Sequence, residues 1–278
     1  MSVTDGAVLV TGASTGIGLA VTQRFAAKGT PVLAGVRNDA DAAKLGAIPN
    51  VEAIVLDVAN AEHVAQLRER LDGVRLSGLV NNAGIAVAGP LEELDLSAWR
   101  QQFDVNFFGV VAVTQASLGA LRAGSGRIVN IGSIGGRLGQ PFMGPYSASK
   151  GAIHLLTESL RRELRPWNIW VSVIEPGAIA TEIWRKAGES APDALSALSD
   201  AGRERYGHQL GQMAKQAQIQ NDGALPVSVV ADAVEHALTA KRPRPTYVLG
   251  RPAQASLVLS SVLPARVMDR LIARIIGI

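Results

Sequence analysis

The stretch AVLVTGASTGIGLA, residues 7–20, contains a short apolar run, a glycine-rich turn and the start of a helical pattern. Every residue from 7 to 10 is apolar, which is typical of a strand covered on both faces in a parallel sheet. Glycines lack a Cβ atom and permit a tight turn in which backbone N–H groups approach a pyrophosphate at the positive end of a helix dipole. The stretch therefore predicts a phosphate-binding turn between the first strand and the first helix.

The rest of the chain alternates strand and helix patterns in the same way. The predicted strands are Ala7–Val10, Val32–Val36, Val51–Leu56, Leu79–Asn81, Arg127–Ile131, Val171–Ile174 and Thr246–Leu249. The predicted helices include Gly16–Lys28, Asp57–Leu71, Ser97–Leu121 and Ser147–Arg165, the last opened just after Pro145 and closed by Pro166. This alternation predicts an α/β class, doubly wound Rossmann fold with a seven-stranded, mostly parallel sheet and helices on both faces, in one domain over residues 1–278.

Two segments interrupt the alternation. Residues 182–224 are polar, alanine-rich and without a strand pattern, so we expect a helical insertion beside the sheet. Residues 251–278 form a tail with an apolar helical stripe (Val267, Met268, Leu271, Ile272, Ile275 and Ile276) beside Arg266, Arg270 and Arg274. This basic amphipathic helix is expected to pack on its own domain or a sister subunit, and weak peripheral membrane contact is the alternative.

Composition excludes several classes of function. The 278 residues include no cysteine, which excludes disulfides, thiolate zinc sites and a cysteine nucleophile, and the four scattered histidines give no metal-binding pattern. A net charge of +3 is too small and too dispersed to predict a nucleic-acid partner. The start of the chain lacks the apolar run of a signal peptide, and no apolar run reaches the length of a membrane span. We therefore expect a cytoplasmic protein without a metal site.

Further motifs follow the glycine-rich turn in order: Asn81-Asn82-Ala83-Gly84, Asn106, Ser133, Tyr146-Ser147-Ala148-Ser149-Lys150, and Pro176-Gly177 with Thr181. Together with TGASTGIG, residues 11–18, they resemble the short-chain dehydrogenase/reductase family over about residues 5–182. The long tail and the second-strand pattern are similar to those of retinol and 17β-hydroxysteroid dehydrogenase-like members. The resemblance implies an enzyme that transfers hydride between a nicotinamide cofactor and an alcohol or carbonyl compound.

A proton-transfer group is predicted independently by residue spacing. Tyr146 and Lys150 are four residues apart on a predicted helix and so lie on one face. A phenol with a pKa of about 10 must become about three units more acidic to exchange protons near neutrality, and we expect the Lys150 ammonium to supply much of this. The Ser133 hydroxyl can donate to a carbonyl oxygen that gains negative charge. The alternative is a capping serine, a buried tyrosine and a surface lysine.

The family resemblance assigns roles to these and other residues. It implies that Ser133 holds the substrate oxygen, Tyr146 transfers the proton, Lys150 also binds the nicotinamide ribose, and Asn106 supports a proton relay through water. The remaining residues that it implies for cofactor binding are Gly12, Ser14, Thr15, Gly16, Ile17, Gly18, Val58, Asn82, Ala83, Gly84, Pro176, Gly177, Ile179 and Thr181.

Cofactor choice is predicted from the end of the second strand, Gly35-Val36-Arg37-Asn38. A carboxylate there would accept hydrogen bonds from the adenosine ribose and exclude a 2′-phosphate, but this chain has Val36 followed by Arg37. A guanidinium can pair with that phosphate, so NADP(H) is the preferred cofactor, with an ordinary solvated arginine as the alternative. Asp57 is expected either to contact the adenine amino group, by the resemblance, or to cap a helix.

The predicted function is an NADP(H)-dependent oxidoreductase that interconverts an alcohol and a ketone or aldehyde. Apolar side chains near the catalytic motif and in the insertion favour a lipophilic small molecule, although they equally suit simple packing. These residues are Phe142, Met143, Ile183, Trp184, Tyr206, Leu210 and Met213. The alternative is a non-catalytic dinucleotide-binding sensor or scaffold. Helices 97–121 and 147–165 resemble those that family dimers and tetramers use, so a homodimer or homotetramer is expected.

Overall fold

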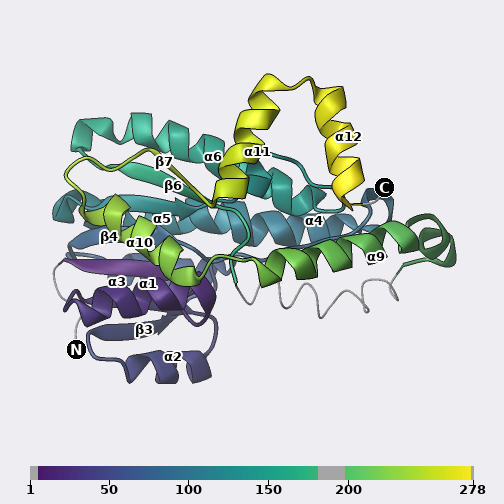
Figure 1. Cartoon of the computed structure of the whole chain (residues 1–278). Coiled ribbons are helices and arrows are strands. Elements are labelled where there is room, and N and C mark those ends of the chain that lie inside the picture. The colour runs from purple at the N-terminus through teal and green to yellow at the C-terminus, as the bar shows by residue number, and fades with distance from the viewer. Residues whose placement is uncertain (1–5, 181–197, 277–278) are drawn as a thin grey trace.

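The computed structural model describes residues 6–180 and 198–276, and seven parallel strands form its central sheet. The strands are β1 (Ala7–Thr11), β2 (Val32–Val36), β3 (Val51–Val55), β4 (Leu76–Asn81), β5 (Arg127–Ile131), β6 (Val171–Pro176) and β7 (Thr246–Leu249). Their order is β3-β2-β1-β4-β5-β6-β7, and each neighbouring pair is parallel (Figure 1). The predicted doubly wound α/β fold is confirmed, with a sheet that is parallel throughout.

Helices cover both faces of this sheet because each inner strand presents apolar side chains to both sides. Val8 and Val10 of β1 pack in one core with α1 (Gly16–Ala27), α2 (Asp39–Gly46) and α10 (Val227–Thr239). Ala7 and Leu9 of the same strand pack in a second core with α3 (Ala61–Arg70), α5 (Gly109–Gly124) and α6 (Gly144–Glu163). Burial on both faces explains why the strand is continuously apolar, without the alternation of a one-sided sheet.

Several predicted helix boundaries were wrong. The helix expected from Asp57 begins at Ala61, because Asn60 accepts hydrogen bonds from the backbone N–H groups of Glu62 and His63 and caps it. Pro145 lies within the first turn of α6, where a missing N–H group costs nothing. The helices α2 and α10 were not predicted; α2 has a single fully buried side chain, so its apolar periodicity is weak.

The helix predicted over 97–121 is a composite of three parts. It consists of α4 (Leu96–Phe103), the π-helical turn η2 (Asp104–Phe108) and α5. Among the described residues, this 29-residue stretch is the one segment long and apolar enough to cross a membrane. Half of its most apolar window is buried within the protein, which is typical of a core helix.

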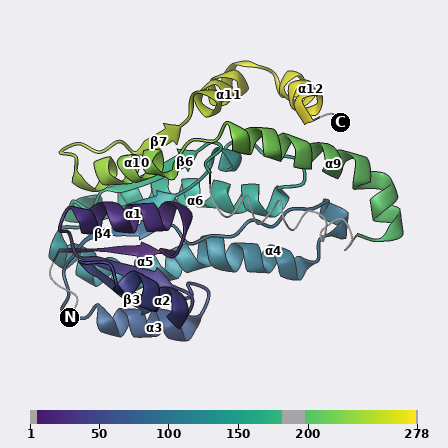
Figure 2. The same ribbon diagram turned by 60° about the horizontal axis from the view of Figure 1, so that its bottom comes forward.

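The described part of the insertion is the long helix α9 (Asp200–Asp222), and the tail forms two helices, α11 (Arg251–Val262) and α12 (Ala265–Ile276). Figures 1 and 2 show α11 and α12 as a hairpin that leaves the body of the molecule at the start of α11 and returns toward α9, which α12 contacts. The order of strands reverses between β1 and β4, so the loops after these two strands run in opposite directions. Ligands of open α/β sheets bind at this crevice, beyond the carboxyl ends of the strands.

Candidate active site

The glycine-rich turn after β1 requires glycine at particular positions. Gly12 and Gly16 have φ angles of 63° and 54°, which favour glycine. A Cβ atom on Gly18 would lie 2.2 Å from the Gly12 carbonyl oxygen and 2.5 Å from Asn82 Nδ2. Thr15 is the N-cap residue of α1 but makes no capping hydrogen bond with its side chain. The first backbone N–H groups of α1 can therefore donate to a bound ligand. This turn fits a pyrophosphate bound by backbone N–H groups at the helix N-terminus.

The loop after β4 holds the glycine-rich turn in place. Asn82 Nδ2 donates to the carbonyl oxygens of Thr11 and Gly12 at 2.9 and 3.0 Å. In return, Thr11 Oγ1 accepts the backbone N–H groups of Asn82 and Ala83, both at 3.0 Å. The motif Asn81-Asn82-Ala83-Gly84 therefore braces the two diverging loops of the crevice.

Buried amides also fix the middle of the sheet against the helices that carry the catalytic candidates. Asn81 Nδ2 donates to Asn130 Oδ1 at 2.9 Å and to Thr114 Oγ1 at 3.1 Å. Asn130 Nδ2 in turn donates to Thr157 Oγ1 of α6 at 2.9 Å. Neither Asn81 nor Asn130 was predicted as a site residue; two buried asparagines at matched positions of neighbouring strands were the available signal.

A cavity of about 530 Å³ lies at the carboxyl ends of the strands. It brings together most of the predicted residues: Gly12, Ser14, Thr15, Gly16, Ile17, Arg37, Asp57, Val58, Asn82, Ala83, Gly84, Ser133, Tyr146, Lys150, Pro176, Gly177 and Ile179. Gly18 and Asn106 do not line it, and Thr181 lies outside the described residues. Residues that sequence reasoning missed include Ile85, Arg100, Gln101, Asp104 and Val105, which reach the cavity from the loop after β4 and from the α4–η2 helix.

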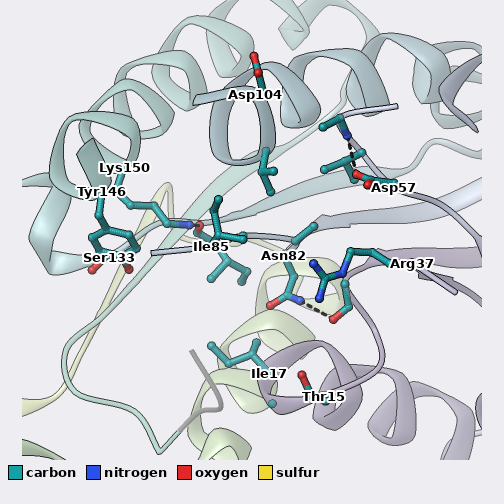
Figure 3. Close-up of a pocket in the computed structure, with 18 of the residues that line it drawn as sticks. Thr15, Ile17, Arg37, Asp57, Asn82, Ile85, Asp104, Ser133, Tyr146 and Lys150 are labelled. Atoms are coloured by element: carbon teal, nitrogen blue, oxygen red, sulfur yellow. Dashed lines mark hydrogen bonds between the residues drawn. The ribbon is translucent and has the colours of Figure 1, made fainter. Parts of the chain in front are cut away.

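Ser133, Tyr146 and Lys150 lie together at one side of this cavity, and Arg37 and Asp57 lie at the other (Figure 3). All three catalytic candidates are buried, so Lys150 is not a surface lysine. Ser133 also caps the turn η3 (Ile134–Gly136), accepting the Gly135 N–H at 3.0 Å. The capping role and the place in the cavity therefore coexist in one residue.

In the ligand-free protein the pKa of Tyr146 is raised, and its acidification by Lys150 beside a bound nicotinamide stays a prediction. Burial raises the pKa of Tyr146 above its usual value of 10, although a side-chain hydrogen bond with Ser133 opposes this. Lys150 Nζ lies 5.9 Å from the centre of the Tyr146 ring and donates to the Ile131 carbonyl oxygen at 2.7 Å. Burial also lowers the pKa of Lys150 from 10.5 to about 8. Desolvation is therefore the larger influence on Tyr146 in the ligand-free protein, and it favours the protonated phenol.

Asn106 lies behind the cavity wall, in the π-helical turn. Its Oδ1 accepts the Ile85 N–H at 2.8 Å, and its Nδ2 donates to the Ile85 carbonyl at 3.0 Å and to Ser149 Oγ at 3.3 Å. The side chain is thus engaged in joining the loop after β4 to α6. Its side chain does not line the cavity, and its bond to Ser149 supports a role in positioning the helix that carries Lys150.

The two residues predicted for the adenosine end differ in their surroundings. Arg37 is exposed and makes no side-chain hydrogen bond or ion pair within the part of the chain that the structure describes. Asp57 is not the helix cap; its Oδ1 accepts the Ala59 N–H at 3.0 Å in a turn that precedes α3 (Figure 3). Its backbone N–H donates to His63 Nδ1. Both side chains border the cavity and can meet a ligand there.

The apolar residues predicted for substrate contact lie outside the cavity lining wherever the structure describes them. The Phe142 and Tyr206 rings meet edge to face with their centres 5.9 Å apart, and Met143 is buried. Neither they nor Leu210 and Met213 line the cavity formed by the described residues. Ile183 and Trp184 lie outside the described residues. Tyr206 also bonds to Glu92, which ties α9 to the loop before α4.

Comparison with known proteins agrees with this geometry. The family model for short chain dehydrogenases matches residues 6–192. The chain is 35% identical over 274 residues to the NADPH-dependent 3-dehydrocapnine reductase of Ornithobacterium rhinotracheale, covering 95% of this chain and 94% of that protein. It is 39% identical over 216 residues to a 3-amino-tetrahydro-pyrrolizinone reductase of Xenorhabdus hominickii, covering 76% and 75%.

Solved structures are also similar to this chain. A short chain dehydrogenase of Burkholderia cenocepacia, solved in complex with NADP, superimposes with a TM-score of 0.74 at 28% identity and 99% coverage of both chains. The glycine-rich turn, the Ser133–Tyr146 hydrogen bond and the buried lysine lie within the region that the family model matches. The chain belongs to the short-chain dehydrogenase/reductase family and is an oxidoreductase that acts on CH–OH groups.

Proposed function

We propose that the protein is an NADPH-dependent reductase of a ketone or aldehyde. The observation that carries this proposal is the placement of Tyr146, whose buried phenol is hydrogen-bonded with Ser133 in the cavity that begins at the glycine-rich turn. A phenol hydrogen-bonded at the carbonyl oxygen can give up its proton as negative charge develops there, and reduction of a carbonyl group consumes a proton at oxygen. Two of the relatives above are named as reductases, which supports the same direction.

Ser133, Tyr146 and Lys150 have different roles in the proposed reduction. NADPH, when bound, supplies the hydride. Ser133 and Tyr146 hold the carbonyl oxygen by hydrogen bonds, and these strengthen as negative charge develops on it. Tyr146 then gives its proton to that oxygen. Lys150, with a pKa of about 8, is still mostly protonated at pH 7 and lies where it can stabilise the phenolate that remains.

We propose NADP(H) as the preferred cofactor on the basis of Arg37. Its guanidinium is exposed at the cavity border and is not engaged by any described side chain, so it is free to pair with a 2′-phosphate. Val36 is a cavity-lining residue without a carboxylate that would repel this phosphate. Comparing kcat/KM for NADPH and NADH tests this, and equal or better use of NADH would contradict it.

A panel of lipophilic ketones and aldehydes with NADPH tests the activity itself. Tyr146→Phe is expected to lower kcat by roughly 100- to 10,000-fold, since it removes the proton donor. The dissociation constant for NADPH should change little. Tyr247→Phe is the matched control, because Tyr247 is also buried and hydrogen-bonded, to His236 and to the Arg244 N–H, but lies outside the cavity. Binding of NADPH with no turnover across the panel would favour a dinucleotide-binding sensor instead.

Self-association is a further part of the proposal. Two large apolar side chains on the helices predicted to pair, Phe108 and Leu155, are exposed in the single chain. Covering such side chains with a second copy stabilises a dimer by the hydrophobic effect. Sedimentation at several concentrations tests this, and a monomer at all of them would contradict it.

A further inference from the structure

The α11–α12 hairpin, residues 251–276, is attached to the body of the protein at its base. Ala253 in the first turn of α11 is buried and packs against Gly177, which lines the cavity. The whole of α11 is 12 residues, or about 18 Å, long and ends just before the turn at Pro264. The two views in Figures 1 and 2 agree that α11 projects from the body at this base and that α12 turns back toward α9, with which it is in contact.

The outer half of the hairpin exposes apolar side chains. On α11, the exposed fractions are 63% for Val258, 46% for Leu259 and 72% for Val262. On α12, Val267 and Leu271 are also exposed. Residues four apart on a helix share a face, so both helices present an apolar row near the turn that joins them. Single exposed apolar residues are ordinary, but five within 14 residues form a surface that prefers an apolar environment.

The same hairpin carries the charge excess of the whole chain. Residues 251–278 contain four arginines and one acidic residue, Asp269, a net charge of +3 that equals that of the full sequence. Arg266, Arg270 and Arg274 recur every four residues, one position before Val267 and Leu271, so a cationic row borders the apolar row. Within residues 6–180 and 198–276, these three arginines have no ion pair.

We propose that the α11–α12 hairpin docks the protein on an anionic phospholipid surface. Adjacent apolar and cationic rows are the features that hold a helix at the boundary between acyl chains and anionic headgroups. A second copy of the chain is a poorer occupant, since it would bring two rows of arginines together with a single acidic residue on each hairpin to offset them. The cytoplasmic leaflet of a membrane has the required negative potential.

Flotation of the full-length protein with phospholipid vesicles tests the proposal. The wild type is expected to float with phosphatidylcholine vesicles that contain phosphatidylglycerol, and much less with phosphatidylcholine alone. Substituting Arg266, Arg270 and Arg274 with glutamine should lower the partition coefficient about 100-fold, because each arginine contributes roughly a factor of five. Val258→Ser with Val262→Ser should lower it at least about tenfold through lost apolar burial. Added salt should weaken binding.

Matched controls separate the hairpin from general surface effects. Substituting Arg68, Arg165 and Arg242 with glutamine removes the same charge from other exposed positions and should leave vesicle binding within about twofold of the wild type. Circular dichroism and thermal unfolding show that each variant is folded. The proposal is overturned if the wild type does not bind anionic vesicles, or if both arginine triples bind equally. It is also overturned if Val258→Ser with Val262→Ser dissolves a dimer while vesicle binding is unchanged.

Discussion

Replacing Lys150 with methionine is expected to stabilise the ligand-free protein near neutral pH while abolishing its activity. Lys150 is buried, and burial lowers its pKa from 10.5 to about 8. The folded chain therefore holds the proton less tightly than the unfolded chain, so the charged side chain opposes folding. Methionine has a similar length and no charge to bury.

The magnitude follows from the two pKa values. At about 1.4 kcal/mol per pKa unit, the difference corresponds to about 3 kcal/mol of unfolding free energy below pH 8, where both states are protonated. Methionine also loses the hydrogen bond that Lys150 Nζ donates to the Ile131 carbonyl, worth about 1 kcal/mol. The net expectation at pH 7 is that the substitution raises the free energy of unfolding by about 2 kcal/mol.

The sign of the pH dependence is a second signature of the same effect. Between its folded and unfolded pKa values the unfolded chain binds more protons at Lys150, so stability rises with pH. From pH 7 to pH 10 the expected rise is about 2–3 kcal/mol in the wild type, and it disappears in Lys150→Met. Above pH 10 the raised pKa of Tyr146 acts in the opposite direction, because the unfolded phenol then loses its proton first.

Urea unfolding of both proteins from pH 7 to pH 10 measures these quantities. Lys241→Met, at an exposed position, is the matched control and should show the same pH dependence as the wild type. The reasoning is refuted if Lys150→Met is less stable than the wild type at pH 7, or if its unfolding free energy rises with pH as steeply. NADPH titration of the variant then tells whether the lost activity includes lost cofactor binding.

Three further predictions concern the cofactor site and its support. Gly18→Ala should lower NADPH affinity at least about tenfold and stability by about 1–3 kcal/mol, because the added Cβ atom would overlap the backbone. Gly119→Ala, where the added Cβ atom meets open space, is the control and should stabilise α5 by about 0.5–1 kcal/mol. NADPH titration measures the affinity, and urea unfolding measures the stability. Arg37→Gln should raise the dissociation constant for NADPH about 10- to 100-fold and leave that for NADH unchanged, and equal effects on both would contradict the 2′-phosphate contact. Glu175 is buried and accepts hydrogen bonds from His154 at 2.8 Å and Arg137 at 3.3 Å, so Glu175→Gln should cost about 1–3 kcal/mol of stability and lower kcat. Arg162→Gln, which breaks an exposed ion pair with Glu158, should cost about 0.5 kcal/mol or less.

The start of α3 could not be predicted from the sequence, because more than one residue nearby is a suitable N-cap. Asp57 and Asn60 are both suitable caps, and tertiary packing of Val64 and Leu67 on the second core decides which turn begins α3. The π-helical turn between α4 and α5 was not predicted from the sequence. It places Asn106 where its side chain bonds to Ile85, a contact between separate segments that local sequence patterns do not reveal.

The sequence by itself determined the parallel sheet and the place of the cofactor turn, because apolar runs and glycine spacing are local consequences of strand burial and backbone sterics. It also placed Tyr146 and Lys150 on one helical face. Only the tertiary structure decided their protonation, since the Ile131 carbonyl that holds Lys150 comes from a strand 19 residues away and the desolvation comes from the whole core. Likewise, the apolar row of the hairpin was visible in the sequence, but its exposure depends on which faces the rest of the fold covers.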